Sequence, residues 1–430
     1  MSTIMSNATV GQILKELYVG QKVTDMTYKD NPFLAMVKKE EKFPGKYIPI
    51  PVKYGNSQGA SSTFSSAYNN QSSNLVAEFL VTKVADFSIA TIDGQLYASA
   101  SDDLGAFVNG LEFLIDGAWD EAVTRLASAL FRNGAGTIAQ IASVTNIAGS
   151  QYLITLSNPD DNVQFDVNQT LVAVQFVDGS GTAPTDTAVI YQVDRNNGLL
   201  YVTSATNIAS DWVAGYFLAT QGDLPSASNN NFQPNGSTAT NSLLKLSGLA
   251  AWIPVGGPPV SDSFFGVNRN LDNTRLAGIS FDGTSLSIEE AILKGSAKMF
   301  LQGAKPDVGV CSAATYNALV TSLGSKLVYI DQKVGAIGFR GVEINGAAGV
   351  IHVFPDRSCP DGLVYLLEMD TWCLRSAGGA PHILSNVDGI EILRIPQSDS
   401  YELRVGSYMQ FYTNKPGRNG VVRIQVEEFA

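Results

Sequence analysis

The longest uninterrupted hydrophobic pattern in the chain runs from Ser101 to Gly134. Apolar residues recur there at alternating steps of three and four, the spacing that places them along one stripe of an α-helix. The stripe consists of Leu104, Val108, Leu111, Ile115, Ala118, Ala122, Leu126 and Ala129. Asp102 and Asp103 suit the start of a helix, and Gly134 suits its end. About 32 residues at ~1.5 Å each predict a rod of roughly 48 Å, against which other layers can pack.

The first 45 residues contain one short amphipathic stretch. Residues 9–19 place apolar side chains at helical spacing: Val10, Ile13, Leu14, Leu17 and Tyr18. This stretch is too short to form a stable isolated helix, so we expect it to dock on another surface. Residues 21–45 show weak periodicity, with one helical turn expected at Pro32–Lys39. These features predict an arm over residues 1–45.

An asymmetric hairpin is expected next. Residues 47–54 alternate and contain two prolines, which mark an edge strand. The returning strand is expected over residues 77–92, where Phe79 and Val81 are prominent apolar positions. Residues 55–74 between them are almost all small or polar and form no core of their own. Because two strands alone are marginal in water, this hairpin needs a surface to lie on, and none is evident in a lone chain.

The residues after the long helix follow a β pattern. Turn-rich sequences separate short apolar runs over residues 141–223, which predicts a small barrel or sandwich. The expected strands are residues 152–156, 170–176, 188–193, 199–203 and 216–219. Residues 226–241 have the composition of a linker.

From Leu243 the pattern becomes mixed. Helices are expected at residues 243–252, at 288–303 after a capping box that begins at Ser287, and at 313–323 after Ser312. Strands are expected at residues 308–311, 342–344, 350–354, 364–368, 390–395, 402–411 and 421–426. The chain as a whole is therefore expected to be of the α+β class.

Composition and charge exclude several classes of protein. No run approaches the ~18 apolar residues of a membrane span, and the first residues lack the pattern of a secretory signal. The odd number of cysteines, Cys311, Cys359 and Cys373, suits buried reduced thiols. A net charge of -12 argues against a protein devoted to binding nucleic acid. The charge is uneven, since residues 1–60 carry eight Lys against five acids and residues 138–225 carry eight Asp and one Arg.

One motif suggests catalysis. Gly55-Asn-Ser-Gln-Gly59 matches the G-x-S-x-G pattern of serine hydrolases, and His352 and His382 follow in the order that a triad requires. That motif needs a helix directly after the serine, but a loop rich in serine and asparagine follows Ser57. No Cys or His pair has zinc-binding spacing, and no phosphate-binding loop is present. We therefore expect no catalytic residues, no cofactor and no metal.

The order of arm, hairpin, long helix, β insert and mixed α/β region resembles the major capsid proteins of tailed bacteriophages, which have the Hong Kong 97-like fold. Residues 284–305, 307–323, 360–372, 401–416 and 421–426 carry the resemblance, together with the element order. It implies an N-terminal arm (1–45), an extended loop (46–98), the spine helix of a peripheral domain (99–137), an inserted all-β domain (138–225), a linker and return (226–283), a second peripheral helix (284–306), an axial domain (307–389) and C-terminal strands (390–430).

The resemblance also implies a function. Copies of the chain would form the pentamers and hexamers of an icosahedral shell around double-stranded DNA, assembled in the host cytoplasm and found in the virion. Implied partners are a separate scaffolding protein, a portal protein, a decoration protein and packaged DNA bound non-specifically, with no membrane. The side chains expected to contact neighbouring subunits are Ile13, Leu14, Leu17, Tyr18, Lys53, Phe79 and Val81.

Some alternatives stay open. An encapsulin-like compartment would use the same fold to enclose enzymes, and a serine hydrolase would use Ser57. A phage tail or adhesion protein is disfavoured by the long helix and the lack of repeats. Some members of the family crosslink a loop Lys to an Asn of another subunit. Lys53, Lys83 and Asn414 lie in suitable regions, but no motif fixes that chemistry.

Overall fold

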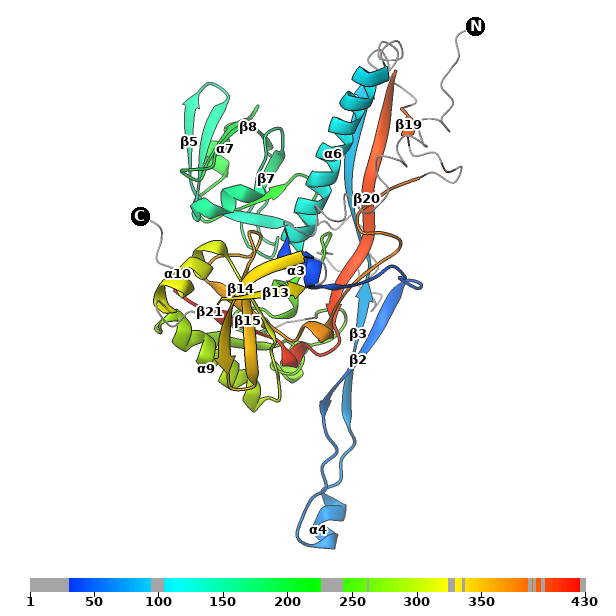
Figure 1. Ribbon diagram of the computed structural model, residues 1–430, viewed down its shortest axis with the longest axis vertical. Helices are drawn as coiled ribbons and strands as arrows, with labels where there is room; N and C mark the ends of the chain where they lie inside the picture. Colours follow the sequence, from blue (N-terminus) through cyan, green and yellow to red (C-terminus); the bar gives the residue numbers. More distant parts are fainter. Residues whose placement is uncertain are drawn as a thin grey trace.

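The computed structural model describes residues 31–93, 104–225, 243–260, 263–323, 329–334, 337–385, 389, 392–395 and 399–425. The expected helix at residues 9–19 and the linker at 226–241 lie outside these ranges. The fold mixes α and β structure. A rod-like helix and a long β-ribbon form one end, a β-barrel lies beside the helix, a mixed sheet with two helices forms the body, and a hairpin projects from it (Figure 1).

The long helix, α6, spans Leu104–Ala129 and follows one ribbon of strands. It ends before the predicted stop at Gly134, because the helix tightens after Ala129 and the Phe131 amide donates to the Ser128 carbonyl. The ribbon pairs β4 (Val84–Asp93) with β20 (Ser400–Thr413) in antiparallel register, and α6 covers one face of it. The six-stranded sheet is completed by β1 (Lys38–Glu40), β17 (Trp372–Ser376), β18 (His382–Ile383) and β19 (Ile392–Arg394).

The hairpin differs from its prediction. β2 (Tyr47–Gly55) pairs with β3 (Leu75–Thr82), but the expected return strand is two strands that belong to different sheets. At Lys83 the chain leaves the hairpin and continues as β4 beside β20. The prediction that the hairpin finds no surface in its own chain is also wrong. Its root rests on the body, where Ile48, Ile50 and Val52 are buried. The polar tip holds a short helix, α4 (Phe64–Asn69), which the sequence did not predict.

Residues 137–220 form a closed barrel in the strand order β10-β5-β6-β9-β8-β7. The strands are β5 (Thr137–Ala148), β6 (Gln151–Leu156), β7 (Thr170–Val174), β8 (Ala188–Asp194), β9 (Leu199–Thr203) and β10 (Phe217–Thr220), with a 3-10 turn η1 (Pro159–Gln164) and a short helix α7 (Ile208–Asp211). Alternating inward residues form a separate core that includes Phe165 and Trp212. Five strands lie where the sequence predicts them, and β5 is the additional one.

The body is a seven-stranded mixed sheet in the order β11-β21-β16-β12-β15-β14-β13. Its strands are β11 (Ile279–Asp282), β12 (Val308–Cys311), β13 (Tyr329–Val334), β14 (Ile337–Gly346), β15 (Gly349–Pro355), β16 (Leu363–Leu367) and β21 (Gly420–Arg423). Helices α9 (Ile288–Leu301) and α10 (Ala313–Leu323) pack on it. Both helices begin as predicted, since Ser287 Oγ accepts from the Glu290 amide and Ser312 Oγ from the Thr315 amide.

The sheets do not follow the predicted segment boundaries. Helix α9, expected as a second peripheral helix, packs against β21 and β11 of the body. Strand β17, expected within an axial domain, pairs with β20, and β21 returns to the body. The expected helix at residues 243–252 is reduced to α8 (Leu249–Trp252), and the expected turn at 32–39 is α3 (Pro32–Met36).

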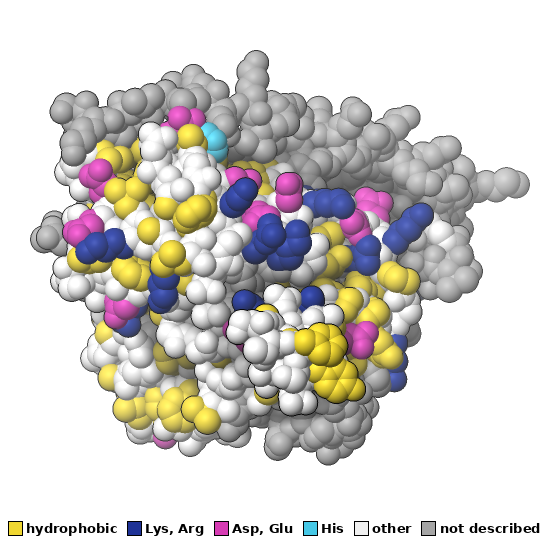
Figure 2. Space-filling model, turned by 90° about the horizontal axis from the view of Figure 1, so that it is seen from below, with side chains coloured by type: hydrophobic (Ala, Val, Ile, Leu, Met, Phe, Trp, Pro, Cys, Tyr) yellow, Lys and Arg dark blue, Asp and Glu magenta, His cyan; other side chains and the backbone are white. Residues whose placement is uncertain are grey.

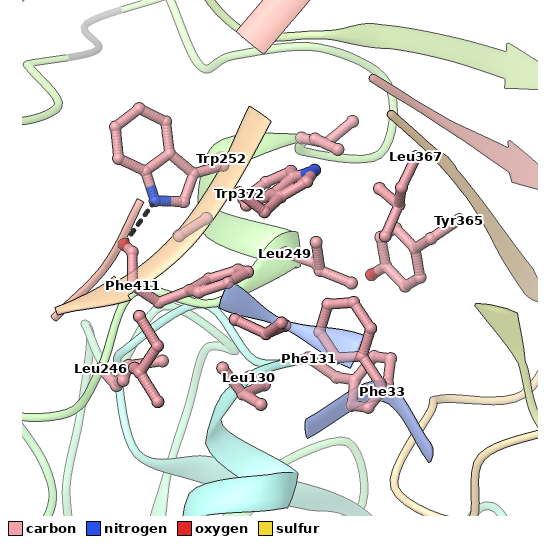
Figure 3. Packing of buried hydrophobic residues seen from close by; sticks show 14 of the residues in the cluster. Phe33, Leu130, Phe131, Leu246, Leu249, Trp252, Tyr365, Leu367, Trp372 and Phe411 are labelled. Carbon is pink, nitrogen blue, oxygen red and sulfur yellow. Dashed lines mark hydrogen bonds between the residues drawn. The ribbon is translucent and has the colours of Figure 1, made fainter. Parts of the chain in front are cut away.

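One aromatic core joins these parts where α6 ends. Phe33 of α3 lies 5.0 Å from Phe131 between ring centroids, and Trp372 stacks on Phe411 at 4.7 Å (Figure 3). Trp252 packs in the same cluster and donates its indole N–H to the Phe411 carbonyl at 3.0 Å. Cys311, Cys359 and Cys373 are buried free thiols. The spine helix, the hairpin root and the body therefore share one core.

Candidate interaction surfaces

The hairpin is held rigidly at its root. Phe79 and Val81 are 0% exposed, and the Phe79 ring lies 5.4 Å from that of Trp252. The Leu80 amide donates to the carbonyl of Phe265, a residue with a φ of 48° that forms a tight turn against β3. Both predicted contact residues are therefore used inside this chain, and we do not retain them as contacts with a neighbouring subunit.

The tip of the hairpin exposes a pair of aromatic rings. Phe64 is 87% and Tyr68 63% exposed on α4, and their rings stack at a centroid distance of 6.4 Å. Leu75 and Val76 at the start of β3 are exposed as well. Figure 2 looks at the molecule from this end and shows apolar side chains gathered on the projecting tip. We call Phe64, Tyr68, Leu75 and Val76 the tip patch.

Hydrogen bonds across the loop give the tip a defined shape. The Ser57 amide donates to Asn74 Oδ1 at 2.9 Å, and the Ser72 amide donates to the Gln58 carbonyl at 2.8 Å. These bonds close the loop from both sides of α4. An ordered loop that presents two stacked rings to solvent has the character of a binding surface rather than of a linker.

A second apolar surface lies on the β4–β20 ribbon, on the face opposite α6. Phe87, Ile89 and Tyr408 are exposed there, with Phe87 edge-on to Tyr408 at 5.8 Å. Gly406 leaves room for the Phe87 ring to lie across the ribbon. Among the described strands β4 pairs with β20 alone, so its other edge is open. We call Phe87, Ile89 and Tyr408 the ribbon patch. Sequence reasoning missed this patch. Apolar residues at both odd and even positions of residues 84–92 indicate a strand with two apolar faces.

The other predicted contact residues have different outcomes. Lys53 is exposed on β2, where it remains available to a partner. Ile13, Leu14, Leu17 and Tyr18 lie outside the described residues. The role of all five residues in assembly stays a prediction.

A half-buried charge cluster fixes the crossing of four segments. Arg125 Nη2 of α6 lies 2.9 Å from Asp86 Oδ1 of β4 and 3.1 Å from Asp223 Oδ2 at the end of the barrel. Lys245 Nζ approaches the same two carboxylates at 2.9 and 3.2 Å. Burial alone would raise the pKa of Asp86, but Lys245 and Arg125 outweigh it and hold that pKa below its usual value. The barrel is thereby tied to the spine helix.

The structure does not bring Ser57 and the two histidines together as a hydrolase would require. Ser57 is exposed on the projecting hairpin, and α4 starts at Phe64 instead of directly after the serine. His352 lies on β15 with Nδ1 3.2 Å from Glu343, and His382 Nδ1 lies 2.6 Å from the Gly379 carbonyl. The residues that the structure describes contain no group of three His, Cys, Asp or Glu side chains placed to hold a metal ion. Within the same ranges, no helix is long and apolar enough to cross a membrane.

The chain has distant neighbours among solved structures. No protein-family profile matches it, and no curated protein matches it. The capsid asymmetric unit of cyanophage A-1(L) aligns at a TM-score of 0.47 and 11% identity, covering 94% of each chain. The capsid of a native GTA particle aligns at 0.44 and 7%, covering 93% of this chain and 91% of that one. The satellite phage P4 procapsid aligns at 0.33 and 9%, covering 94% and 99%. Similarity at this level leaves the function to be argued from the geometry of this chain.

Proposed function

We propose that this chain is the major capsid protein of a bacteriophage, a structural subunit that assembles as pentamers and hexamers into an icosahedral shell around double-stranded DNA. The observation that carries the proposal is the projecting hairpin, whose tip ends in the exposed rings of Phe64 and Tyr68. A lone protein gains nothing from holding two aromatic rings in water at the end of a rigid arm.

The partner that fits the tip patch is a second copy of this chain. The ribbon patch offers Phe87, Ile89 and Tyr408 beside an edge of β4 that pairs with no other described strand. It lies far along the molecule from the tip (Figure 1). A contact between two different patches of identical subunits is heterologous, so each copy can bind one neighbour and be bound by another. Such contacts close into rings, and rings of five and six build a curved shell.

The remaining parts have roles in the same assembly. Residues 9–19 would dock their apolar stripe on a neighbour. Exposed lysines would contact packaged DNA through its phosphates, without sequence preference. They include Lys38 and Lys42 before the hairpin and Lys53, which lies opposite Val76 on β2. The acidic barrel would face away from that DNA. A separate scaffolding protein, a portal protein and a decoration protein remain expected partners.

The test is an assembly assay on a double variant of the tip, Phe64→Ser with Tyr68→Ser. Both side chains are exposed, so the variant should keep the circular dichroism spectrum and melting temperature of the parent protein. Sedimentation velocity should show the large assemblies of the parent replaced by slow species. Tyr191→Ser, which removes an exposed ring from the barrel, is the matched control and should assemble normally. Normal assembly of the tip variant would contradict the proposal.

A further inference from the structure

A cavity of about 330 Å³ separates the barrel from the body where η1 approaches the end of α6 and the start of α10. Its walls carry five charged side chains: Arg132, Asp160, Asp161, Arg357 and Asp361. Asp160 and Asp161 belong to the barrel, whereas the other three come from the spine and the body. One side of the barrel therefore contacts the body through charged side chains. We call this contact, formed by the five residues above, the seat.

The pairing within this seat is loose. Arg132 Nη2 lies 3.8 Å from Asp161 Oδ1, which is beyond hydrogen-bond distance. Asp361 instead accepts a hydrogen bond from Asn158 Nδ2 at 2.8 Å, and this bond holds it close to η1. Arg357 Nη2 donates to Thr124 Oγ1 on α6 at 3.3 Å. Three carboxylates thus converge, and among the described residues Arg132 alone forms an ion pair with one of them.

The barrel has a second connection to the rest of the chain, and in this one the charges are closely paired. Asp223, where the chain leaves the barrel, lies within 3.2 Å of both Arg125 and Lys245. That connection is balanced in charge and well paired. A barrel fixed firmly on one side and loosely on the other can tilt about the firm side.

We propose that the contact between η1 and the body is a proton-sensitive seat, which closes when the Asp161 carboxyl is protonated and loosens when it is ionised. The inference concerns the single chain and does not depend on shell assembly. Its geometric basis is the position of Asp161: about a fifth of its side chain is exposed, and it lies between Arg132 and two further carboxylates.

The balance of forces on Asp161 supports this direction. Burial, the largest effect, raises the pKa of Asp161 to about 6, Arg132 lowers it, and Asp361 and Asp160 raise it further. Arg195, which binds the Asn162 and Phe165 carbonyls behind η1, also faces this turn. A carboxyl that binds its proton more tightly when seated favours the seated state as pH falls. With a solvent-exposed value near 3.9 for the open state, the open fraction should rise about tenfold from pH 5 to pH 7.5.

Hydrogen exchange with mass spectrometry on the full chain tests the inference, with protection factors corrected for the intrinsic pH dependence. Peptides covering residues 158–165 and 312–316 should lose about tenfold protection between pH 5 and pH 7.5. Asp161→Asn should abolish that change and retain the low-pH protection. Asp211→Asn, which changes an exposed carboxyl on α7 of the same barrel, should behave like the parent.

A second variant keeps the test decisive if Asp161→Asn fails to fold. Asp361→Asn retains an acceptor for Asn158 but removes a charge that faces Asp161, so the midpoint of the change should move to lower pH. Protection that is independent of pH in the parent would overturn the inference. The inference would also be overturned if the protection in Asp161→Asn depended on pH as it does in the parent.

Discussion

Arg125 Nη2 donates to Asp223 Oδ2 at 3.1 Å, which joins the spine helix to the exit of the barrel across 98 positions of sequence. Asp86 and Lys245 complete the cluster, so the ribbon and the returning chain meet at the same point. Because the side chains of all four residues are less than a quarter exposed, the charges are only partly screened by water.

Removal of the central cation should destabilise the protein. In Arg125→Ala the carboxylates of Asp86 and Asp223 keep Lys245 but lose one of the two cations that balance their negative charge. We expect the free energy of unfolding to fall by roughly 2 kcal/mol, less than the ~3–5 kcal/mol of a pair that loses its only partner. Urea unfolding followed by circular dichroism measures it. Arg394→Ala, which removes an exposed ion pair, is the control and should change stability by less than about 0.5 kcal/mol. Equal effects of the two variants would contradict the importance of the cluster.

The pH dependence of stability should have two parts of opposite sign. The pKa of Asp86 is lowered in the folded protein, so its contribution is complete above the unfolded value near 3.9 and is lost as the pH falls below it. The pKa of Asp161 is raised to about 6, so stability should increase as the pH falls from 7 towards 5. Urea midpoints between pH 3 and pH 8 should therefore pass through a maximum near pH 4–5. The assignment would be contradicted if the urea midpoint rose towards neutral pH and Asp161→Asn left that rise unchanged.

The ribbon patch should tolerate a charge in the monomer but not in the assembly. Ile89 is 56% exposed, so Ile89→Lys should leave the free energy of unfolding within about 0.5 kcal/mol of the parent. If the patch receives a neighbour's hairpin, the new ammonium group would be buried in an apolar contact and assembly should fail. Ile147→Lys, at an exposed position of the barrel, should still assemble. Sedimentation velocity of both variants distinguishes these outcomes.

The N-terminal arm should be required for assembly and dispensable for folding. Deletion of residues 1–20 should leave the melting temperature unchanged but abolish shells, because the stripe of Ile13, Leu14 and Leu17 would no longer dock on a neighbour. Leu14→Asp should have the same effect as the deletion, and Lys15→Ala should have none. Normal shells from the deletion variant would rule out this role for the arm.

Local signals predicted many elements well. The Ser287 and Ser312 caps are confirmed, because capping depends on a few neighbouring residues. The barrel strands were found because alternation and turn residues are also local. Strand β5 was missed because its apolar residues do not alternate with polar ones. Thr137 and Ala139 are buried beside a partly exposed Ile138, and the second half of the strand is mostly exposed.

Contacts between segments that are distant in the sequence could not be predicted from the local hydrophobic pattern. Residues 77–92 have suitable strand composition throughout, and nothing local shows that the chain changes sheets at Lys83, where β20 becomes its partner. For the same reason the burial of Phe79 could not be foreseen, since it depends on Trp252 and on the turn at Phe265. The tip helix lacks an apolar stripe, and its two rings face solvent.

Negative-stain electron microscopy of the purified full chain, with sedimentation and nucleic-acid analysis of the same sample, tests the central claim most directly. We predict closed shells or rings of five and six subunits, and double-stranded DNA in particles taken from infected cells. Shells that contain protein cargo and no DNA would indicate an encapsulin-like compartment. A monomer that persists across salt and protein concentration, with and without a co-expressed scaffolding protein, would contradict the account.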